Sequence, residues 1–149
     1  MLNERICICA GKVFVWNKYP FFTYEEKERR WFLCLGNSIF DEIVFQVTTT
    51  TQLEYYKQDG KRAKNNHFHL KAGMGGLERD CIVDLTQYYE KRTHNDMNNA
   101  KDDIQPKDFL KQDQINTLVR HIAQDRNIIK IEKKAIYQYL RDAGFKVNV

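Results

Sequence analysis

The chain has 149 residues, of which 42% are apolar and 30% charged, so its composition suits one folded domain. This length excludes most multidomain enzymes. The 24 Lys and Arg residues against 20 Asp and Glu residues give a formal net charge of +4. That charge is compatible with a polyanionic partner but does not require one.

The N-terminal region and the cysteines indicate a cytoplasmic protein with no membrane partner. The weakly apolar segment 6–11 is shorter than the roughly 7–15 residues of a signal-peptide core, and no segment approaches the ~20 apolar residues of a membrane span. A disulfide-stapled secreted fold would have more cysteines in a shorter chain. The spacing Cys7-x-Cys9 does not suit structural zinc. We expect all four cysteines to be small buried residues of strands: Cys7, Cys9, Cys34 and Cys81.

The first two thirds of the sequence favour β-strands, because runs of β-branched and aromatic residues alternate with turn residues. The expected strands are 12–16, 31–35, 42–51, 67–70 and 81–85. Between them we expect a connection at 18–30, an exposed basic loop at 55–66 and a glycine turn at 73–76.

The last third favours helices. Apolar residues recur at helical spacing at Ile115, Leu118, Val119 and Ile122, and again at Ala135, Ile136, Tyr139 and Leu140. The second helix is expected at about 132–143 with Gly144 just after its end, and Pro106 at a helix entrance or turn. Strands followed by helices favour an α+β fold or a small barrel with appended helices over a doubly wound fold.

Three motifs that can carry chemistry do not reach the pattern that their chemistry needs. His67-x-His69 places two imidazoles on one face of a strand, but no third metal ligand is evident nearby. The glycines at 73–76 match neither a phosphate loop nor a dinucleotide loop. Ser38 is the only serine and lies outside any nucleophile motif. We therefore expect neither a metal nor a nucleotide cofactor.

A set of polar residues at strand ends is the strongest candidate for a binding site. Arg29 and Arg30 stand directly before one expected strand, and another strand ends in Thr48, Thr49, Thr50, Thr51 and Gln52. A guanidinium matches phosphate oxygens, and hydroxyl groups can hold further oxygens. Aromatic residues that can stack on unpaired bases precede Arg29: Tyr19, Phe21, Phe22 and Tyr24. The same residues also suit a solvated edge, ordinary strand positions, or core and dimer contacts.

Four sequence segments, taken together and in this order, indicate a family: G-K-V-F-V-W at 11–16, R-R-W-F-L-C-L at 29–35, V-T-T-T-T-Q at 47–52 and G-L-E-R-D-C-I-V-D-L-T-Q at 76–87. This order resembles the MazF/PemK (Kid) toxins of toxin–antitoxin pairs, and the last block is the most specific match. The amphipathic segment around 115–122 is similar to their C-terminal helix. The resemblance covers roughly residues 11–126.

The resemblance implies an α+β fold, a small SH3-like β-barrel of about five to seven mostly antiparallel strands with C-terminal helices. It implies a barrel domain at 1–126, a helical extension of the same domain at 127–149, and a homodimer. It implies metal-independent, sequence-selective cleavage of single-stranded RNA, with an acidic antitoxin as partner. Arg30 matches the arginine that stabilises charge on the phosphorus, and Thr50 the threonine that holds the phosphate. Arg29, Thr48, Thr51, Gln52, Tyr24 and Gln87 are the expected substrate-binding residues.

Several residues depart from the family or leave a role open. Trp31 replaces the family proline after the arginine, which can change the backbone at Arg30. A carboxylate for proton transfer is available in the loop before Arg30, at Glu25, Glu26 and Glu28, with no basis for choosing among them. In the triplet 78–80 we expect Arg79 to be structural, paired with a carboxylate or a turn carbonyl. Two alternatives remain: a barrel that binds a protein target, like the gyrase-poisoning toxins, or one that binds RNA without cleavage.

Overall fold

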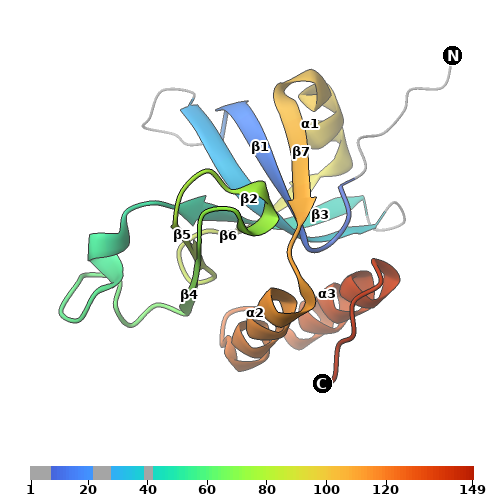
Figure 1. The fold of residues 1–149 in the computed structure, drawn as a ribbon. Coiled ribbons are helices and arrows are strands. Elements are labelled where there is room, and N and C mark those ends of the chain that lie inside the picture. The colour runs from blue at the N-terminus through green and yellow to red at the C-terminus, as the bar shows by residue number, and fades with distance from the viewer. Residues whose placement is uncertain (1–7, 22–27, 39–41) are drawn as a thin grey trace, which may run out of the picture.

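Seven strands form one antiparallel sheet with helices on both of its faces (Figure 1). This is a computed structural model, and it describes residues 8–21, 28–38 and 42–149; every count below refers to these residues. The strands are β1 (Lys12–Tyr19), β2 (Glu28–Ser38), β3 (Ile43–Thr50), β4 (His67–Leu70), β5 (Cys81–Asp84), β6 (Tyr89–Thr93) and β7 (Ile104–Phe109). The α-helices are α1 (His94–Asn99), α2 (Gln112–Gln124) and α3 (Lys130–Asp142), and short 3-10 helices are η1 (Leu53–Tyr56), η2 (Met74–Gly76) and η3 (Lys101–Asp103).

Strand β3 is the centre of the topology. The strand order is β4-β5-β3-β2-β1-β7, and β6 also pairs with β3. Along one edge β3 pairs with β2; along the other, residues 43–47 pair with β6 and Thr49 and Thr50 pair with β5. All of these pairs are antiparallel, and the sheet is not closed. The expected α+β class with a mostly antiparallel sheet and C-terminal helices is confirmed at this level.

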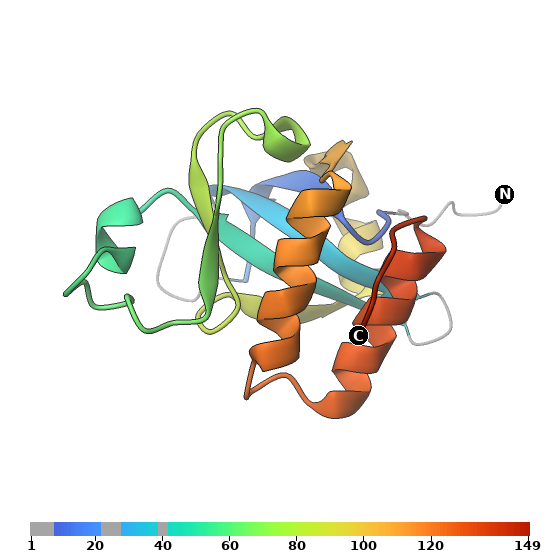
Figure 2. The ribbon, with the colours of Figure 1, turned by 60° about the horizontal axis from the view of Figure 1, so that its bottom comes forward.

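Two apolar cores lie on opposite faces of the sheet, because side chains alternate along each strand. In β2, Leu33 and Leu35 enter the larger core under α2 and α3. Phe32 and Cys34 enter the smaller core, which also contains Met97 of α1. Figure 2 shows α2 and α3 lying together across one face of the sheet.

Helix α2 follows its predicted apolar stripe, whereas α3 does so only in part, because Ala135 is half-buried and Tyr137, which was not predicted, is buried. All four predicted stripe residues of α2 are buried. In α3 the buried residues are Ile136, Tyr137 and Leu140, while Tyr139 is partly buried over Gly36 of β2. The amide of Phe145 donates to the carbonyl of Leu140 at 3.0 Å after Gly144, the predicted C-terminal glycine. None of the described helices is long and apolar enough to cross a membrane.

The segment 127–149 shares the larger core with the rest of the chain. Ile128, Ile136, Leu140 and Val147 all belong to that core. Beyond α3, the amide of Lys146 donates to Gln112 Oε1 of α2 at 2.9 Å, and Arg141 donates to the carbonyl of Val147 at 3.0 Å. The segment is thus packed as part of the same folded unit.

Several expected elements differ from the structure. β1 and β2 extend into the supposed connection, so Arg29 and Arg30 lie inside β2 and not before it. β6, α1 and β7 were not predicted. β6 has no fully buried residue and β7 has only one, so neither shows a pattern of alternating apolar residues. Pro106 lies in β7, which is an edge strand and tolerates the missing amide, and not at a helix entrance.

The expectation for the cysteines holds for two of them. Cys34 and Cys81 are buried, and burial raises the pKa of the Cys81 thiol to about 11, which keeps it protonated at neutral pH. Cys9 is exposed before β1, so its prediction was wrong, because an apolar run near a strand does not fix which side chains are covered. Cys7 lies outside the described residues.

Gly75 of η2 offers a test of how this turn packs on the sheet. Its φ is +61°, and a Cβ atom would lie 2.4 Å from Cγ2 of Val13 and 3.1 Å from Cδ2 of Leu110. We expect Gly75→Ala to lower the free energy of unfolding by about 2–4 kcal/mol in urea denaturation, from backbone strain and overpacking together. Gly73→Ala is the control, since Gly73 also has positive φ but no atom within 4 Å of its Cβ position. Equal losses in the two variants would contradict the close packing.

Candidate functional site

A cleft of about 420 Å³ opens where β2 begins and β3 ends. Residues from β2, β3, η1 with the loop after it, and the turn into β6 line it: Arg29, Arg30, Trp31, Thr48, Thr49, Thr50, Thr51, Gln52, Tyr55, Lys61, Arg62, Gln87, Tyr88 and Glu90. Four of these side chains are cationic and one is anionic. The cleft is therefore suited to a negatively charged ligand.

The predicted site residues come together in this cleft. Arg29, Arg30, Thr48, Thr50, Thr51, Gln52 and Gln87 all line it. The antiparallel pairing of β2 with β3 explains this, because Phe32 opposite Thr48 places the start of β2 beside the end of β3. Tyr24, Glu25 and Glu26 lie outside the described residues, and for Glu28 the structure describes only the backbone.

Successive side chains at the start of β2 and the end of β3 point to opposite faces of the sheet. Arg30 and Phe32 share the face of the smaller core, and Thr48 pairs with Phe32 on that face. Arg29 and Trp31 alternate to the other face, where they line a second cavity of about 230 Å³. The two cavities share Arg29, Trp31, Thr49 and Thr51, so together they form one groove over the strand ends.

The four threonines at 48–51 differ in how far their side chains are exposed to solvent. Thr48 is 2% exposed and its hydroxyl is covered, so it forms part of the floor. Thr49 donates to the carbonyl of Trp31 at 3.3 Å, which ties β3 to β2. Thr50 accepts from the amide of Gln52 at 3.2 Å, and Thr51 is exposed. Thr50 and Thr51 are therefore better placed than Thr48 to contact a ligand.

An aromatic and basic wall closes the cleft on the side of the loop after η1. Arg62 donates to Tyr88 Oη at 2.9 Å, and its guanidinium lies 5.1 Å from the ring centroid of Tyr55. Lys61 Nζ lies 4.0 Å from the same centroid. The sequence indicated only an exposed basic loop here, and it gave no sign that Tyr55 and Tyr88 hold the cations over the cleft. Aromatic rings beside cations are typical of surfaces that bind single-stranded nucleic acid.

Asp84 fixes this wall to the sheet. It is fully buried, and its Oδ2 accepts from Tyr56 Oη at 2.6 Å and from Asn65 Nδ2 at 2.9 Å. Its Oδ1 accepts from the amides of Thr86 and Gln87, both at 2.9 Å. Burial and the bond to Asp84 raise the pKa of Tyr56, which keeps Tyr56 a donor. One carboxylate thus joins β5, the loop after η1 and the turn that carries Gln87.

The triplet 78–80 differs from its expected role. Asp80 accepts from the amide of Ala72 at 2.8 Å, and Glu78 forms an exposed ion pair with Arg29 at 3.4 Å. Within the described chain, Arg79 makes no hydrogen bond or ion pair; it is exposed and lines the second cavity. The structural role expected of Arg79 belongs to Asp80, and Arg79 is instead a cation of the groove.

Trp31 keeps a regular strand geometry where the family has proline. It pairs with Val15 in the ladder between β1 and β2. Two cations lie near its ring, the Arg29 guanidinium at 5.3 Å and Lys107 Nζ at 5.6 Å from the centroid. The residue lines both cavities of the groove.

Tyr19 and Phe21 do not form the expected base-stacking platform. Tyr19 is 1% exposed at the end of β1 and stacks on Trp16 at 5.0 Å between centroids. Phe21 packs edge-on against Trp16 at 5.8 Å, with the Arg92 guanidinium 4.1 Å from its ring. Both rings belong to the smaller core and its rim, because β1 is longer than predicted; Phe22 lies outside the described residues.

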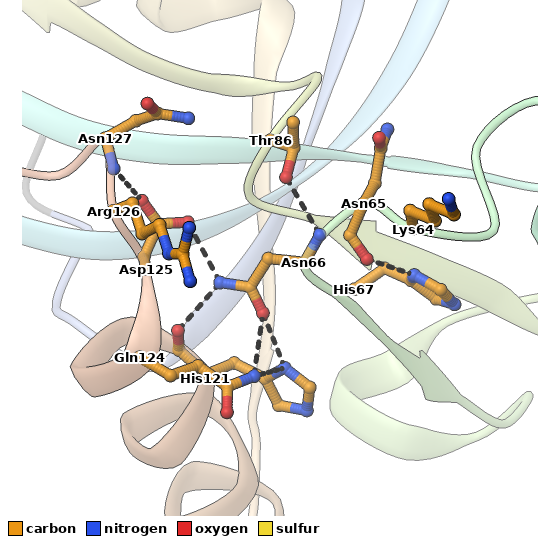
Figure 3. Close-up of a pocket in the computed structure, with 10 residues that line it drawn as sticks. All are labelled: Lys64, Asn65, Asn66, His67, Thr86, His121, Gln124, Asp125, Arg126 and Asn127. Carbon is orange, nitrogen blue, oxygen red and sulfur yellow. Dashed lines mark hydrogen bonds between the residues drawn. The ribbon is translucent and has the colours of Figure 1, made fainter.

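A third cavity, of about 450 Å³, lies between β4 and the end of α2 (Figure 3). Asn66 is at its centre: its side chain donates to the carbonyl of His121 at 2.8 Å and to Asp125 at 2.9 Å, and its Oδ1 faces His121 Nδ1 at 2.7 Å. Burial lowers the pKa of His121, so it is neutral at pH 7. These groups satisfy one another and hold the basic loop to α2. In the described chain no group of three or more His, Cys, Asp or Glu side chains could hold a metal ion.

Comparison of the chain with known protein families and with curated proteins found no match to either.

Proposed function

We propose that this chain is a toxin-like, sequence-selective endoribonuclease that cleaves single-stranded RNA without a metal ion. The observation that supports this is the convergence of residues from three separate segments, 29–30, 48–52 and 87, in one cationic cleft. They fall in three of the four segments that carry the resemblance to the MazF/PemK toxins. A phosphodiester in this cleft would meet guanidinium groups, hydroxyl groups and an amide side chain within one surface.

The proposed reaction uses the RNA's own 2′-hydroxyl. Its oxygen attacks the adjacent phosphorus, the bond to the 5′-oxygen breaks, and a cyclic phosphate and a 5′-hydroxyl result. Because the nucleophile is intramolecular, the protein needs only to orient the chain, stabilise charge and carry protons. We assign charge stabilisation to Arg30 and phosphate binding to Thr50, as the resemblance implies, with Arg29, Thr51, Gln52 and Gln87 contacting the flanking nucleotides.

The fold and the partners are part of the same proposal. We infer that the antiparallel sheet is an open relative of the SH3-like barrel of these toxins and that the chain forms a homodimer. An acidic, disordered antitoxin segment would compete with RNA for a cleft lined by four cations and one anion.

Trp31 favours a second candidate, an RNA-binding protein that does not cleave. A tryptophan in the groove wall, with two cations near its ring, can hold an unpaired base by stacking. In that case the cleft would bind RNA at the same residues, and the phosphodiester would remain intact.

A comparison of RNA cleavage with DNA cleavage distinguishes the endoribonuclease from the non-cleaving RNA-binding protein. The purified chain is incubated in EDTA with a long single-stranded RNA and with a DNA of the same sequence. We expect defined cuts in the RNA and none in the DNA, because DNA lacks the attacking hydroxyl. Binding of both strands with no cut in either would favour the non-cleaving candidate, and no binding to RNA would exclude both.

A further inference from the structure

Glu90 is the only carboxylate that lines the cleft among the described residues. It lies on β6 opposite Gln46, on the strand face that carries Thr48, so it belongs to the same wall as the expected phosphate site. The carboxylates expected from the sequence precede Arg30. Glu90 was not predicted, because β6 carries no apolar pattern that would place its residues at the site.

The two oxygens of Glu90 have different surroundings. Oε2 accepts from Arg92 Nη2 at 2.9 Å and from the hydroxyl of Tyr19 in a short hydrogen bond. Arg92 Nε also donates to Tyr19 Oη at 3.0 Å, so the three side chains form a closed network. Oε1 accepts no hydrogen bond within the described chain, and the Glu90 side chain is 21% exposed. Oε2 is thus held by two donors, and Oε1 has no partner among the described residues.

This network holds Glu90 in one position. Burial and the bond to Glu90 raise the pKa of Tyr19, which therefore stays protonated and donates. The Arg92 guanidinium supplies the opposite charge, and it is itself packed on the ring of Phe21 at 4.1 Å. A carboxylate that is held in one position and lines the cleft is suited to act as a general base.

We propose that Glu90 is the general base of the RNA cleavage, and that Tyr19 and Arg92 are its positioning residues; this inference rests on the proposed function. Glu90 Oε1 accepts the proton of the 2′-hydroxyl as the 2′-oxygen bonds to phosphorus. The bond from phosphorus to the 5′-oxygen breaks, and that oxygen takes a proton from solvent. Glu90 then returns its proton to solvent, so the protein is unchanged and the products are the cyclic phosphate and the 5′-hydroxyl.

The chain offers a matched control on the opposite face of the sheet. Glu132 of α3 accepts from Tyr89 Oη at 2.7 Å and from Lys91 at 3.3 Å, so it also has a tyrosine and a cation as partners. It does not line the cleft. Glu132→Gln therefore reproduces the loss of a paired carboxylate and its effect on stability without touching the cleft.

The test compares Glu90→Gln, Glu90→Asp and Glu132→Gln in two assays on the full chain: cleavage of RNA at neutral pH, and binding of a 2′-O-methyl RNA that cannot be cleaved. We expect Glu90→Gln to lose about 10²–10⁴-fold in cleavage rate, as for loss of a general base. Binding should be retained. Glu90→Asp, which keeps a carboxylate, should recover part of the cleavage rate, and Glu132→Gln should cleave as the unsubstituted chain does.

Each other outcome overturns a defined part of the proposal. If the unsubstituted chain cleaves and Glu90→Gln cleaves equally, Glu90 is not the base, while the endoribonuclease function stands. If Glu90→Gln and Glu90→Asp lose folding or binding along with cleavage, the role of Glu90 is structural. If the unsubstituted chain does not cleave RNA, the proposed function fails and the assignment of Glu90 fails with it.

Discussion

Replacing Arg30 by alanine should lower the rate of RNA cleavage by about 10²–10³-fold, the loss typical of removing one donor to a developing negative charge. Arg30 lines the cleft where β2 begins, next to the end of β3. Its guanidinium would face the phosphorus as charge develops on the phosphate oxygens. Cleavage of a labelled RNA under single-turnover conditions measures the effect on the chemical step.

Two further variants show whether the loss of cleavage in Arg30→Ala comes from the guanidinium of Arg30 itself. Arg30→Lys keeps the charge but loses the planar donor fork, so we expect only partial recovery of the rate. Arg120→Ala removes an exposed arginine of α2 outside the groove, and it should cleave as the unsubstituted chain does. Equal activity of Arg30→Ala and Arg120→Ala, with both folded, would remove Arg30 from the reaction.

The largest effect on stability is expected at Asp84. Asp84→Ala removes a fully buried carboxylate and leaves four donors without their acceptor: the Tyr56 hydroxyl, the Asn65 amide group and the backbone amides of Thr86 and Gln87. Each unsatisfied buried group costs about 1–3 kcal/mol, and some of these donors can reach water. We therefore expect the free energy of unfolding to fall by about 3–5 kcal/mol in urea denaturation.

The control for Asp84 is an exposed aspartate. Asp102→Ala in η3 removes the same charge from the surface and should change the free energy of unfolding by less than about 0.5 kcal/mol. Asp84→Ala should also weaken RNA binding, because Asp84 anchors the turn with Gln87 and the wall with Arg62. A loss at Asp84 no greater than at Asp102 would show that this carboxylate does not organise the wall.

The elements with strong apolar patterns could be predicted from the sequence. β3 lies close to its expected bounds and α2 contains the expected stripe at 115–122, because each buries a full face against a core. β6 and β7 could not be predicted, since β6 is only half-buried and β7 runs along an edge with one buried residue. Their positions are set by pairing with β3 and β1, which is a tertiary effect that no local pattern records.

The residues of the candidate site likewise fall into those that the sequence could predict and those that it could not. Arg30 and the threonine run could be predicted because they adjoin strongly apolar strands, and strand pairing then places them together. Glu90, Tyr55 and Tyr88 could not, because each depends on a segment whose position only the folded chain defines. Arg79 shows the opposite error: its place in a family motif suggested a structural contact, but its neighbours Glu78 and Asp80 make those contacts.

End-group analysis of RNA treated with the unsubstituted chain in EDTA tests the proposed function most directly. Attack by the 2′-hydroxyl predicts fragments with a 2′,3′-cyclic phosphate at one end and a 5′-hydroxyl at the other, at recurring positions in the sequence. Arg30→Ala, assayed in parallel, should yield these ends at about 10²–10³-fold lower rate. Intact RNA, or fragments that carry a 5′-phosphate, would contradict an endoribonuclease that works by this route.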